Sequence, residues 1–284
     1  MLFRFKKPAT NRNLLRNKEV KILNPILSVH ILKLRSAYLD RKVKVRIYIP
    51  NSEGDLKGTL LLNDGQDMEQ LRLVDILSGL INYEDFPHIA VVAVHANENR
   101  MKEYGIAGFP DFKHRGKKAW RHSHFISREL VPFLQREYGL IKEEQQNVFA
   151  GFSMGGLSAL DISWHNPGLF KKVGVFSGSL WWRSKNAGTP ADDNSRIMHR
   201  LIRKSEKREG LQFWFQTGTK DETGDRNKNG VIDSIDDTRD LINELKSLGY
   251  TEDEIKYVEV ENGEHNFTTW SGIFPDFLRW AFLD

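Results

Sequence analysis

The sequence predicts an α/β fold, with a doubly wound, mostly parallel sheet and an antiparallel pair of strands at its N-terminal end. Three observations predict it. Apolar and polar residues alternate in two early stretches, short unbroken apolar runs follow them, and helical stretches separate those runs. Strands that are buried on both faces give unbroken apolar runs. Regular alternation of such strands with helices gives a parallel sheet with right-handed crossovers.

The elements follow in order along the chain. Residues 29–34 and 43–49 alternate as a half-buried antiparallel pair does, and residues 50–58 form a break that is rich in turn residues. The predicted parallel strands are residues 59–62, 89–94, 148–150, 173–176, 211–215 and 255–260. The predicted helices, with apolar residues at spacings of three and four, are residues 71–81, 124–138, 157–164, 197–205, 237–248 and 267–282.

Composition indicates one globular domain. Of 284 residues, 39% are hydrophobic and 28% are charged, which is typical of a soluble folded protein. We expect residues 1–25 to be a basic, loosely attached N-terminal segment and residues 26–284 to form a single domain. The net charge is only +4. Basic residues gather over residues 4–21, 113–121 and 200–208, which we interpret as solvated termini and helix faces, not as a nucleic-acid site.

Several classes of protein are excluded. The chain has no cysteine, so disulfides, thiolate catalysis and zinc–thiolate sites are ruled out. No apolar run approaches membrane-spanning length, and the basic N-terminus is not followed by the apolar core of a signal peptide. We therefore expect a cytoplasmic protein without nucleic-acid or membrane partners, a signal peptide already removed being the alternative. The sequence does not indicate an oligomeric state.

A candidate nucleophile lies in the segment Gly151-Phe152-Ser153-Met154-Gly155, which directly follows a predicted strand and precedes a helix. Strand, tight turn and helix are the context that the Gly-x-Ser-x-Gly motif requires. The glycines are needed because a side chain at either position would collide with the neighbouring chain in so tight a turn. The sequence therefore predicts Ser153 as a nucleophile at the start of a helix, whose amides favour developing negative charge.

The partners of such a serine follow in the order acid, then histidine. His265 comes after the last predicted strand and before the last helix, so we expect it at the same sheet edge as Ser153 and predict it as the general base. His199 falls within a predicted basic helix, where we expect a surface residue. The acid should follow the strand at 211–215.

Two carboxylates follow that strand. Asp221 is the first choice for the acid, which would hold the histidine in one tautomer, and Glu222 is the alternative. Either one could instead cap the loop or bind a metal. For the oxyanion hole we predict the amide of Met154, next to the nucleophile, and that of Gln66 in the loop after the strand at 59–62. The alternative for that loop is an ordinary Asp-Gly turn.

The segment from Asp225 to Asp236 fits the template of a calcium-binding loop, with glycine at the sixth position. The candidate ligands are Asp225, Asn227, Asn229, Val231 through its carbonyl, Asp233 and Asp236. The last position departs from the template because a bidentate glutamate is usual there. The alternative is a solvated Asn-Gly turn. A structural Ca²⁺ would stiffen the loop that carries Asp221, and we expect no cofactor for catalysis.

Four motifs along the chain are Asn63-Asp64-Gly65-Gln66, Gly151-Phe152-Ser153-Met154-Gly155-Gly156, Ser177-Gly178-Ser179-Leu180-Trp181-Trp182 and Gly263-Glu264-His265-Asn266. Together they resemble the putative esterase family, which includes enterochelin-esterase-like enzymes, esterase D and the antigen 85 mycolyltransferases. The resemblance extends from about residue 27 to the end. It implies an α/β-hydrolase fold and hydrolysis of carboxylic esters, and the third motif points to the enterochelin-esterase-like branch.

Aromatic and basic residues near the predicted site are candidates for substrate binding. Trp181 and Trp182 follow a strand end, so they could line an acyl pocket or pack under a long loop. Arg100 could hold an anionic group of the substrate, and Tyr104 and Trp270 are further candidates. The sequence thus predicts a serine esterase acting on a small-molecule ester. An acyltransferase with the same site and a non-catalytic binding module are the alternatives.

Overall fold

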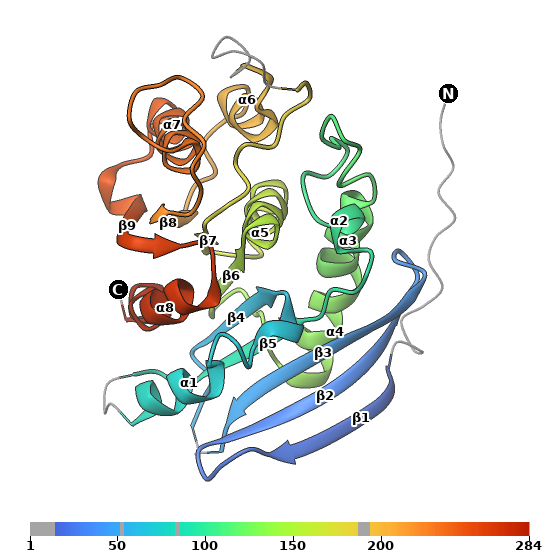
Figure 1. Cartoon of the computed structure of the whole chain (residues 1–284). Coiled ribbons are helices and arrows are strands. Elements are labelled where there is room, and N and C mark those ends of the chain that lie inside the picture. Colours follow the sequence, from blue (N-terminus) through green and yellow to red (C-terminus); the bar gives the residue numbers. More distant parts are fainter. Residues whose placement is uncertain (1–14, 52–53, 83–85, 187–193, 284) are drawn as a thin grey trace.

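The computed structural model describes residues 15–51, 54–82, 86–186 and 194–283 (Figure 1). Its strands are β1 (Leu15–Ile22), β2 (Leu27–Ser36), β3 (Arg41–Pro50), β4 (Gly58–Asn63), β5 (Ile89–Val94), β6 (Gln146–Phe152), β7 (Lys172–Phe176), β8 (Gln212–Lys220) and β9 (Ile255–Glu264). Its helices are η1 (Gly65–Asp67), α1 (Leu73–Ile81), α2 (Arg100–Glu103), α3 (Ala119–His124), the π-helical η2 (Phe125–Leu130), α4 (Val131–Tyr138), α5 (Met154–His165), α6 (Ile197–Arg203), α7 (Asp233–Ser247), η4 (Glu252–Glu254) and α8 (Phe267–Phe282).

The strands form one sheet in the order β1-β2-β3-β5-β4-β6-β7-β8-β9. Pairing is antiparallel from β1 to β5 and parallel from β5 to β9. The predicted fold class, a mostly parallel sheet with antiparallel N-terminal strands, is therefore confirmed. Every residue of β4 and β5 is buried, as their unbroken apolar runs require.

The N-terminal part differs from the prediction, because three antiparallel strands replace the expected pair. The extra strand β1 lies in the segment that we expected to be loosely attached, and it pairs with β2 from Leu15 to Ile22. An edge strand exposes much of its surface and carries charged residues such as Lys18, Glu19 and Lys21, so its sequence shows no apolar face. Residues 1–14 lie outside the described residues.

Helices cover both faces of the sheet (Figure 1). One face packs against α1 and α8, whose residues share a core with β4, β5 and β6. The other face packs against η2, α4, α5, α6 and α7 in two further clusters. None of the helices in the described segments has the length and apolar character that crossing a membrane requires. The layers leave the carboxyl ends of the parallel strands free to build a site.

Candidate active site

Ser153 lies in a strained turn between the end of β6 and the start of α5. Its φ of 54° and ψ of −122° are rare for a residue other than glycine, and such a conformation costs about 1–3 kcal/mol. A Cβ on Gly151 would lie 2.4 Å from the carbonyl carbon of Gly155, and a Cβ on Gly155 would lie 2.8 Å from Asp64 Oδ2. Both glycines of the motif are therefore required by close contacts within the turn.

A cleft of about 440 Å³ lies at the carboxyl edge of the parallel strands and includes Ser153. Segments that follow β5, β6, β7, β8 and β9 all contribute to it, as expected for sheets of this class. Of the residues predicted for catalysis, the oxyanion hole or substrate binding, four do not line it: Gln66, Tyr104, Trp182 and Trp270. The lining residues are Arg100, Met101, Ser153, Met154, Ser177, Gly178, Ser179, Trp181, Asp221, Glu222, Ser234 and His265.

The nucleophile and its predicted partners share this cleft without direct hydrogen bonds between them. The hydroxyl of Ser153 lies 3.4 Å from the hydroxyl of Ser179, and the amide of Ser179 donates to the carbonyl of Ser153. Both carboxylate oxygens of Asp221 are buried and have no hydrogen-bond partner among the described residues. Catalytic hydrogen bonds are often loose without substrate and tighten when it binds, so this geometry is compatible with a triad.

Electrostatic contacts separate the two candidate acids. Burial lowers the pKa of His265 and the charge of Arg100 lowers it further, while Asp221 acts in the opposite direction. Burial raises the pKa of Asp221. The nearby Gly218 amide and Ser177 hydroxyl, which do not meet hydrogen-bond geometry with its oxygens, act in the opposite direction, as does the charge on His265. The interaction between base and acid thus involves Asp221.

Glu222 is engaged elsewhere. Its carboxylate accepts from the amide of Ser234 in the first turn of α7, and burial together with the charge of Asp233 raises its pKa. A carboxylate at a helix N-terminus satisfies one of the free amides there. Glu222 therefore lies at the start of α7 beside the cleft, whereas the charge of Asp221 acts on His265.

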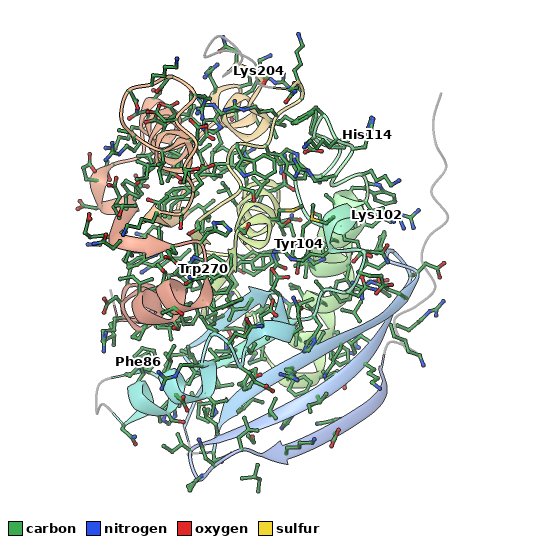
Figure 2. All side chains as sticks on the ribbon, viewed as in Figure 1. Phe86, Lys102, Tyr104, His114, Lys204 and Trp270 are labelled. Carbon is green, nitrogen blue, oxygen red and sulfur yellow. The ribbon has the colours of Figure 1, made fainter. Side chains whose placement is uncertain are left out.

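Two residues had no role in the sequence prediction of the triad: Ser177, which lines the cleft, and Trp270, which does not. Trp270, in the first turn of α8 (Figure 2), donates from Nε1 to the hydroxyl of Ser177 over 2.9 Å. The ring of His265 packs edge-on against Trp270, with 5.2 Å between ring centroids. Ser177 is buried at a positive φ of 43° at the end of β7. Trp270 thus contacts the base directly and the acid's neighbour by a hydrogen bond.

Of the two residues predicted to donate to the oxyanion, Met154 lines the cleft and Gln66 does not. Met154 N–H is the first amide of α5 and so has no partner within the helix. Gln66 lies in η1, where its side chain donates to Asp64 and Asp67 and accepts from the amide of Ala96. Those bonds fix the turn beside β5, but the side chain of Gln66 is exposed, outside the cleft.

Arg100 holds this turn against the nucleophile. Its guanidinium makes two hydrogen bonds of 2.7 Å to the carboxylate of Asp64, which is buried at a φ of 60°. It also stacks on the ring of Tyr104, whose hydroxyl accepts from the amide of Asp64. The arginine that we expected to face an anionic substrate is thus already paired with a carboxylate, although it lines the cleft.

A buried amide and imidazole fix the other side of the turn. Asn63 donates to the carbonyl of Gly155 over 2.8 Å, and His122 Nε2 lies 3.1 Å from the Asn63 carbonyl oxygen. Burial and the charge of Arg41 lower the pKa of His122 to about 3, so its imidazole is neutral and donates to Asn63. No local motif marks this contact in the sequence, because 59 residues separate its partners.

The two adjacent tryptophans go to different environments. Trp182 is fully buried and donates to the carbonyl of Phe109, and added Cβ atoms on Gly105 and Gly116 would lie 2.5 and 2.7 Å from its ring. Trp181 lines the cleft instead, with the guanidinium of Arg115 stacked on its ring. Trp182 thereby packs the segment after β7 against the connection between β5 and α3, and Trp181 forms part of the cleft wall.

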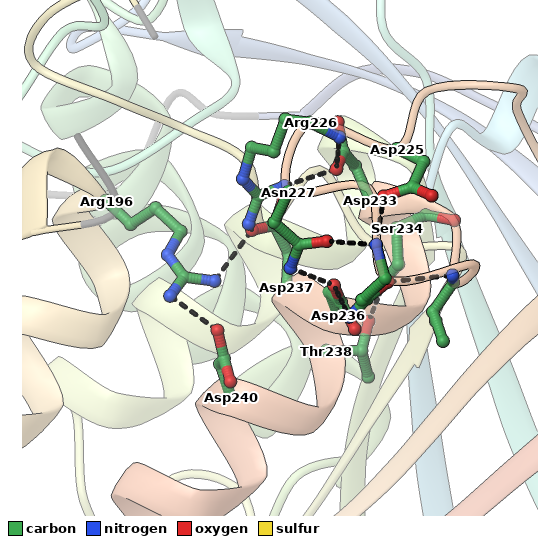
Figure 3. Close-up of polar contacts among 12 residues, drawn as sticks. Arg196, Asp225, Arg226, Asn227, Asp233, Ser234, Asp236, Asp237, Thr238 and Asp240 are labelled. Carbon is green, nitrogen blue, oxygen red and sulfur yellow. Dashed lines mark hydrogen bonds and ion pairs between the residues drawn. The ribbon is translucent and has the colours of Figure 1, made fainter. Parts of the chain in front are cut away.

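The predicted calcium loop is closed by its own side chains in this structure (Figure 3). Asp225 accepts from the amides of Asn229 and Gly230, and Asp236 Oδ2 accepts from the side chains of Asn227 and Asn229. No group of three or more His, Cys, Asp or Glu side chains within the described ranges is arranged to hold a metal. The Asn227 and Asn229 amides therefore present nitrogen, not oxygen, to Asp236.

The start of α7 ties this loop to the rest of the cleft edge (Figure 3). Asp237 is 1% exposed and accepts from Arg196 and Arg226 over 2.7 and 2.6 Å. His199 Nε2 lies 2.8 Å from the Asp237 carbonyl oxygen. The prediction that His199 lies at the surface is wrong, since this residue is only 1% exposed. It is buried because α6 packs against α7 and turns the histidine toward it.

Three comparisons place the chain among known proteins. The family model described as Putative esterase matches residues 36–281. The uncharacterized protein YbbA of Bacillus subtilis is 22% identical over 244 residues, which cover 83% of this chain and 91% of YbbA. Among solved structures, the enterobactin esterase FES from Shigella flexneri has a TM-score of 0.68 at 20% identity, and a ferulic acid esterase has 0.69 at 17%.

The lengths covered differ between these relatives. The structural match to the ferulic acid esterase covers 92% of this chain and 99% of that chain. The match to the enterobactin esterase covers 89% of this chain but only 58% of that chain, so this chain spans little more than half of that protein. At these identities the solved structures show that the fold is shared.

Proposed function

The chain belongs to the Putative esterase family, and from this premise we propose that it is a serine hydrolase that cleaves carboxylic esters through an acyl-enzyme. The observation that carries the proposal is the position of Ser153, at a strained φ of 54° in a cleft that His265 and Asp221 also line. A serine is held in so costly a conformation where the exposure of its hydroxyl has a use.

In the proposed mechanism, Ser153 Oγ attacks the ester carbonyl carbon while His265 removes its proton. The lowered pKa of His265 keeps the imidazole neutral and able to accept that proton near pH 7. Asp221 stabilises the imidazolium that forms, and the amide of Met154, which lines the cleft, holds the oxyanion. The amide of Gln66 is the predicted second donor, and it must approach the cleft when substrate binds, because Gln66 does not line it. His265 then protonates the leaving alcohol, and water, activated by the same histidine, releases the acid.

Around this triad we assign positioning roles to Ser177 and Trp270. Trp270 donates to Ser177 at the end of β7 and packs against His265 after β9, so one side chain links these two strand ends. The amide of Ser153 donates to the carbonyl of Phe176, the residue before Ser177, which ties the nucleophile to the same strand end. The support for these roles is geometric.

The proposal is tested with an activity-based label and simple esters. A fluorophosphonate probe should label the wild-type protein at Ser153, and p-nitrophenyl butyrate should be hydrolysed. Ser153→Ala should lose both, with turnover reduced by at least about 10⁴-fold. Ser179→Ala, which removes the neighbouring hydroxyl, serves as the matched control and should still be labelled.

Each other outcome has a defined meaning. No labelling and no turnover by a folded wild-type protein would refute the hydrolase and favour a binding module on the same fold. Release of p-nitrophenol that is diverted into a new ester by added alcohol would favour acyl transfer. Labelling at Ser179 instead of Ser153 would overturn the assignment of the nucleophile.

A further inference from the structure

A second concavity lies far from the catalytic edge. A groove of about 350 Å³ runs between α1 and the antiparallel strands β2 and β3, and it shares no lining residue with the cleft at Ser153. Its floor is apolar, with Val29 and Ile31 from β2, Leu73 and Val74 from α1, and Met68 before that helix. Pockets of this size and character bind small ligands.

The rim of this groove carries one cation without a counter-charge. Lys21 is paired with Glu19 at 3.2 Å, and Arg72 with Asp75 at 3.2 Å. Arg46 makes no ion pair with any residue in the described part of the chain, and its Nε is buried without a hydrogen-bond partner. The phenol of Tyr48, which also lines the groove, bonds the Arg46 side chain but supplies no charge. The buried Nε is costly, because it has lost water and has no partner among the described residues.

Further positive charges surround Arg46 on the same face. Lys44 precedes it by two positions in β3, and Lys33 pairs opposite Lys44 in β2. Burial lowers the pKa of Lys44, and the charges of Arg46 and Lys33 lower it further. Burial and then the charges of Arg46 and Lys44 lower the pKa of His95 to about 3, and its buried Nε2 has no partner among the described residues.

We propose that this groove binds a monoanionic amphiphile, an alkyl carboxylate whose headgroup pairs with Arg46 and whose chain lies along the apolar floor. A guanidinium fork matches a carboxylate in two parallel hydrogen bonds. The rim also carries Glu69, which disfavours a ligand with two negative charges such as a phosphate monoester. The floor excludes water from an alkyl chain, which favours binding in proportion to the apolar area covered. This inference does not depend on the proposed hydrolase activity.

The test is calorimetric titration of the whole chain with decanoate below its micellar concentration. We expect saturable binding of one decanoate, with decyl phosphate, decanol and decyltrimethylammonium each at least about tenfold weaker. Arg46→Met should weaken decanoate binding at least about tenfold. Val74→Trp, which keeps every charge and fills the groove, should do the same if the chain lies on the floor.

Two control variants and one readout of folding make the result decisive. Arg136→Gln removes an equal charge from α4 on the opposite face, and Trp181→Ala alters the cleft, so both should leave decanoate binding unchanged. Thermal melting verifies that each variant is folded. Equal binding of decanol, tighter binding of decyl phosphate, or loss of decanoate binding in Trp181→Ala with Arg46→Met unaffected would each overturn the proposal.

Discussion

The two sides of the cleft are held by different physical means. On the serine side the backbone decides: Gly151 and Gly155 leave no room for a Cβ, and Asn63 bonds the carbonyl of Gly155. On the acid–base side, contacts between side chains set the geometry. His265 lies in an exposed turn, where its ring packs against Trp270. The oxygens of Asp221 are buried without hydrogen bonds among the described residues. A substitution that adds a Cβ on the serine side should disrupt the fold of the turn outright. A substitution on the acid–base side can instead change the charge or the alignment of a catalytic group in small steps.

The largest effect should come from the acid. Asp221→Asn keeps the shape of the side chain but removes the charge that stabilises the imidazolium, so kcat/KM for p-nitrophenyl butyrate should fall by about 10³–10⁴-fold. Glu222→Gln, the adjacent and matched change, should stay within about threefold of the wild type, because Glu222 caps α7. The reverse ranking would make Glu222 the acid.

The same pair of variants predicts a shift of the pH profile. Because burial and Arg100 lower the pKa of His265, the acid limb of kcat/KM should lie below the ordinary histidine value of about 6.5. Asp221 acts to raise that pKa, so Asp221→Asn should move the limb to still lower pH. A limb that moves upward, or moves in Glu222→Gln instead, would contradict this assignment.

The serine side should fail through stability. Gly151→Ala places a Cβ 2.4 Å from backbone of Gly155, so we expect a loss of about 3 kcal/mol in the free energy of unfolding, measured by urea denaturation, together with loss of labelling at Ser153. Gly272→Ala in α8 is the control, since nothing lies within 4 Å of its added Cβ. That change should stabilise by about 0.5–1 kcal/mol. Equal effects of both changes would refute the steric argument.

A smaller effect should come from the bond behind the acid–base side. Trp270→Phe keeps a ring against His265 but removes the indole N–H that Ser177 accepts. We expect kcat to fall by about tenfold while KM changes little, because Trp270 does not line the cleft and the catalytic groups lose alignment. Reduced stability with unchanged kcat would show that Trp270 only supports the fold.

The smallest effect on activity should come from calcium. Binding by the Asp225–Asp236 loop stays a prediction, and it requires Asn227 and Asn229 to turn their oxygens inward, away from the present bonds to Asp236. If calcium binds, millimolar calcium should stabilise the protein by about 1–3 kcal/mol, and EDTA should reverse the shift in Tm. Asp225→Asn should abolish the shift. A Tm unmoved by both additions would argue against the site.

Local patterns in the sequence predicted the strands, helices and turns that neighbouring residues determine. The predicted strand at 89–94 and helix at 267–282 coincide with β5 and α8, and Ser153 lies at the predicted turn. Tertiary contacts could not be predicted in this way. The bond between Trp270 and Ser177 joins residues 93 positions apart. Adjacent residues such as Trp181 and Trp182 share a local pattern, so only the packing of distant loops separates their environments.

The placement of charges on β1 and β9 bears on how the protein behaves in concentrated solution. Among the described residues the sheet ends in β1 and β9, whose outer backbone groups have no partner strand there, and such edges can recruit the edges of other molecules into aggregates. Lys18, Glu19 and Lys21 are exposed on β1, and Lys256 and Glu259 are exposed on β9. Side-by-side pairing with a second sheet would bring these ammonium and carboxylate groups out of water, so both margins resist fibrous assembly.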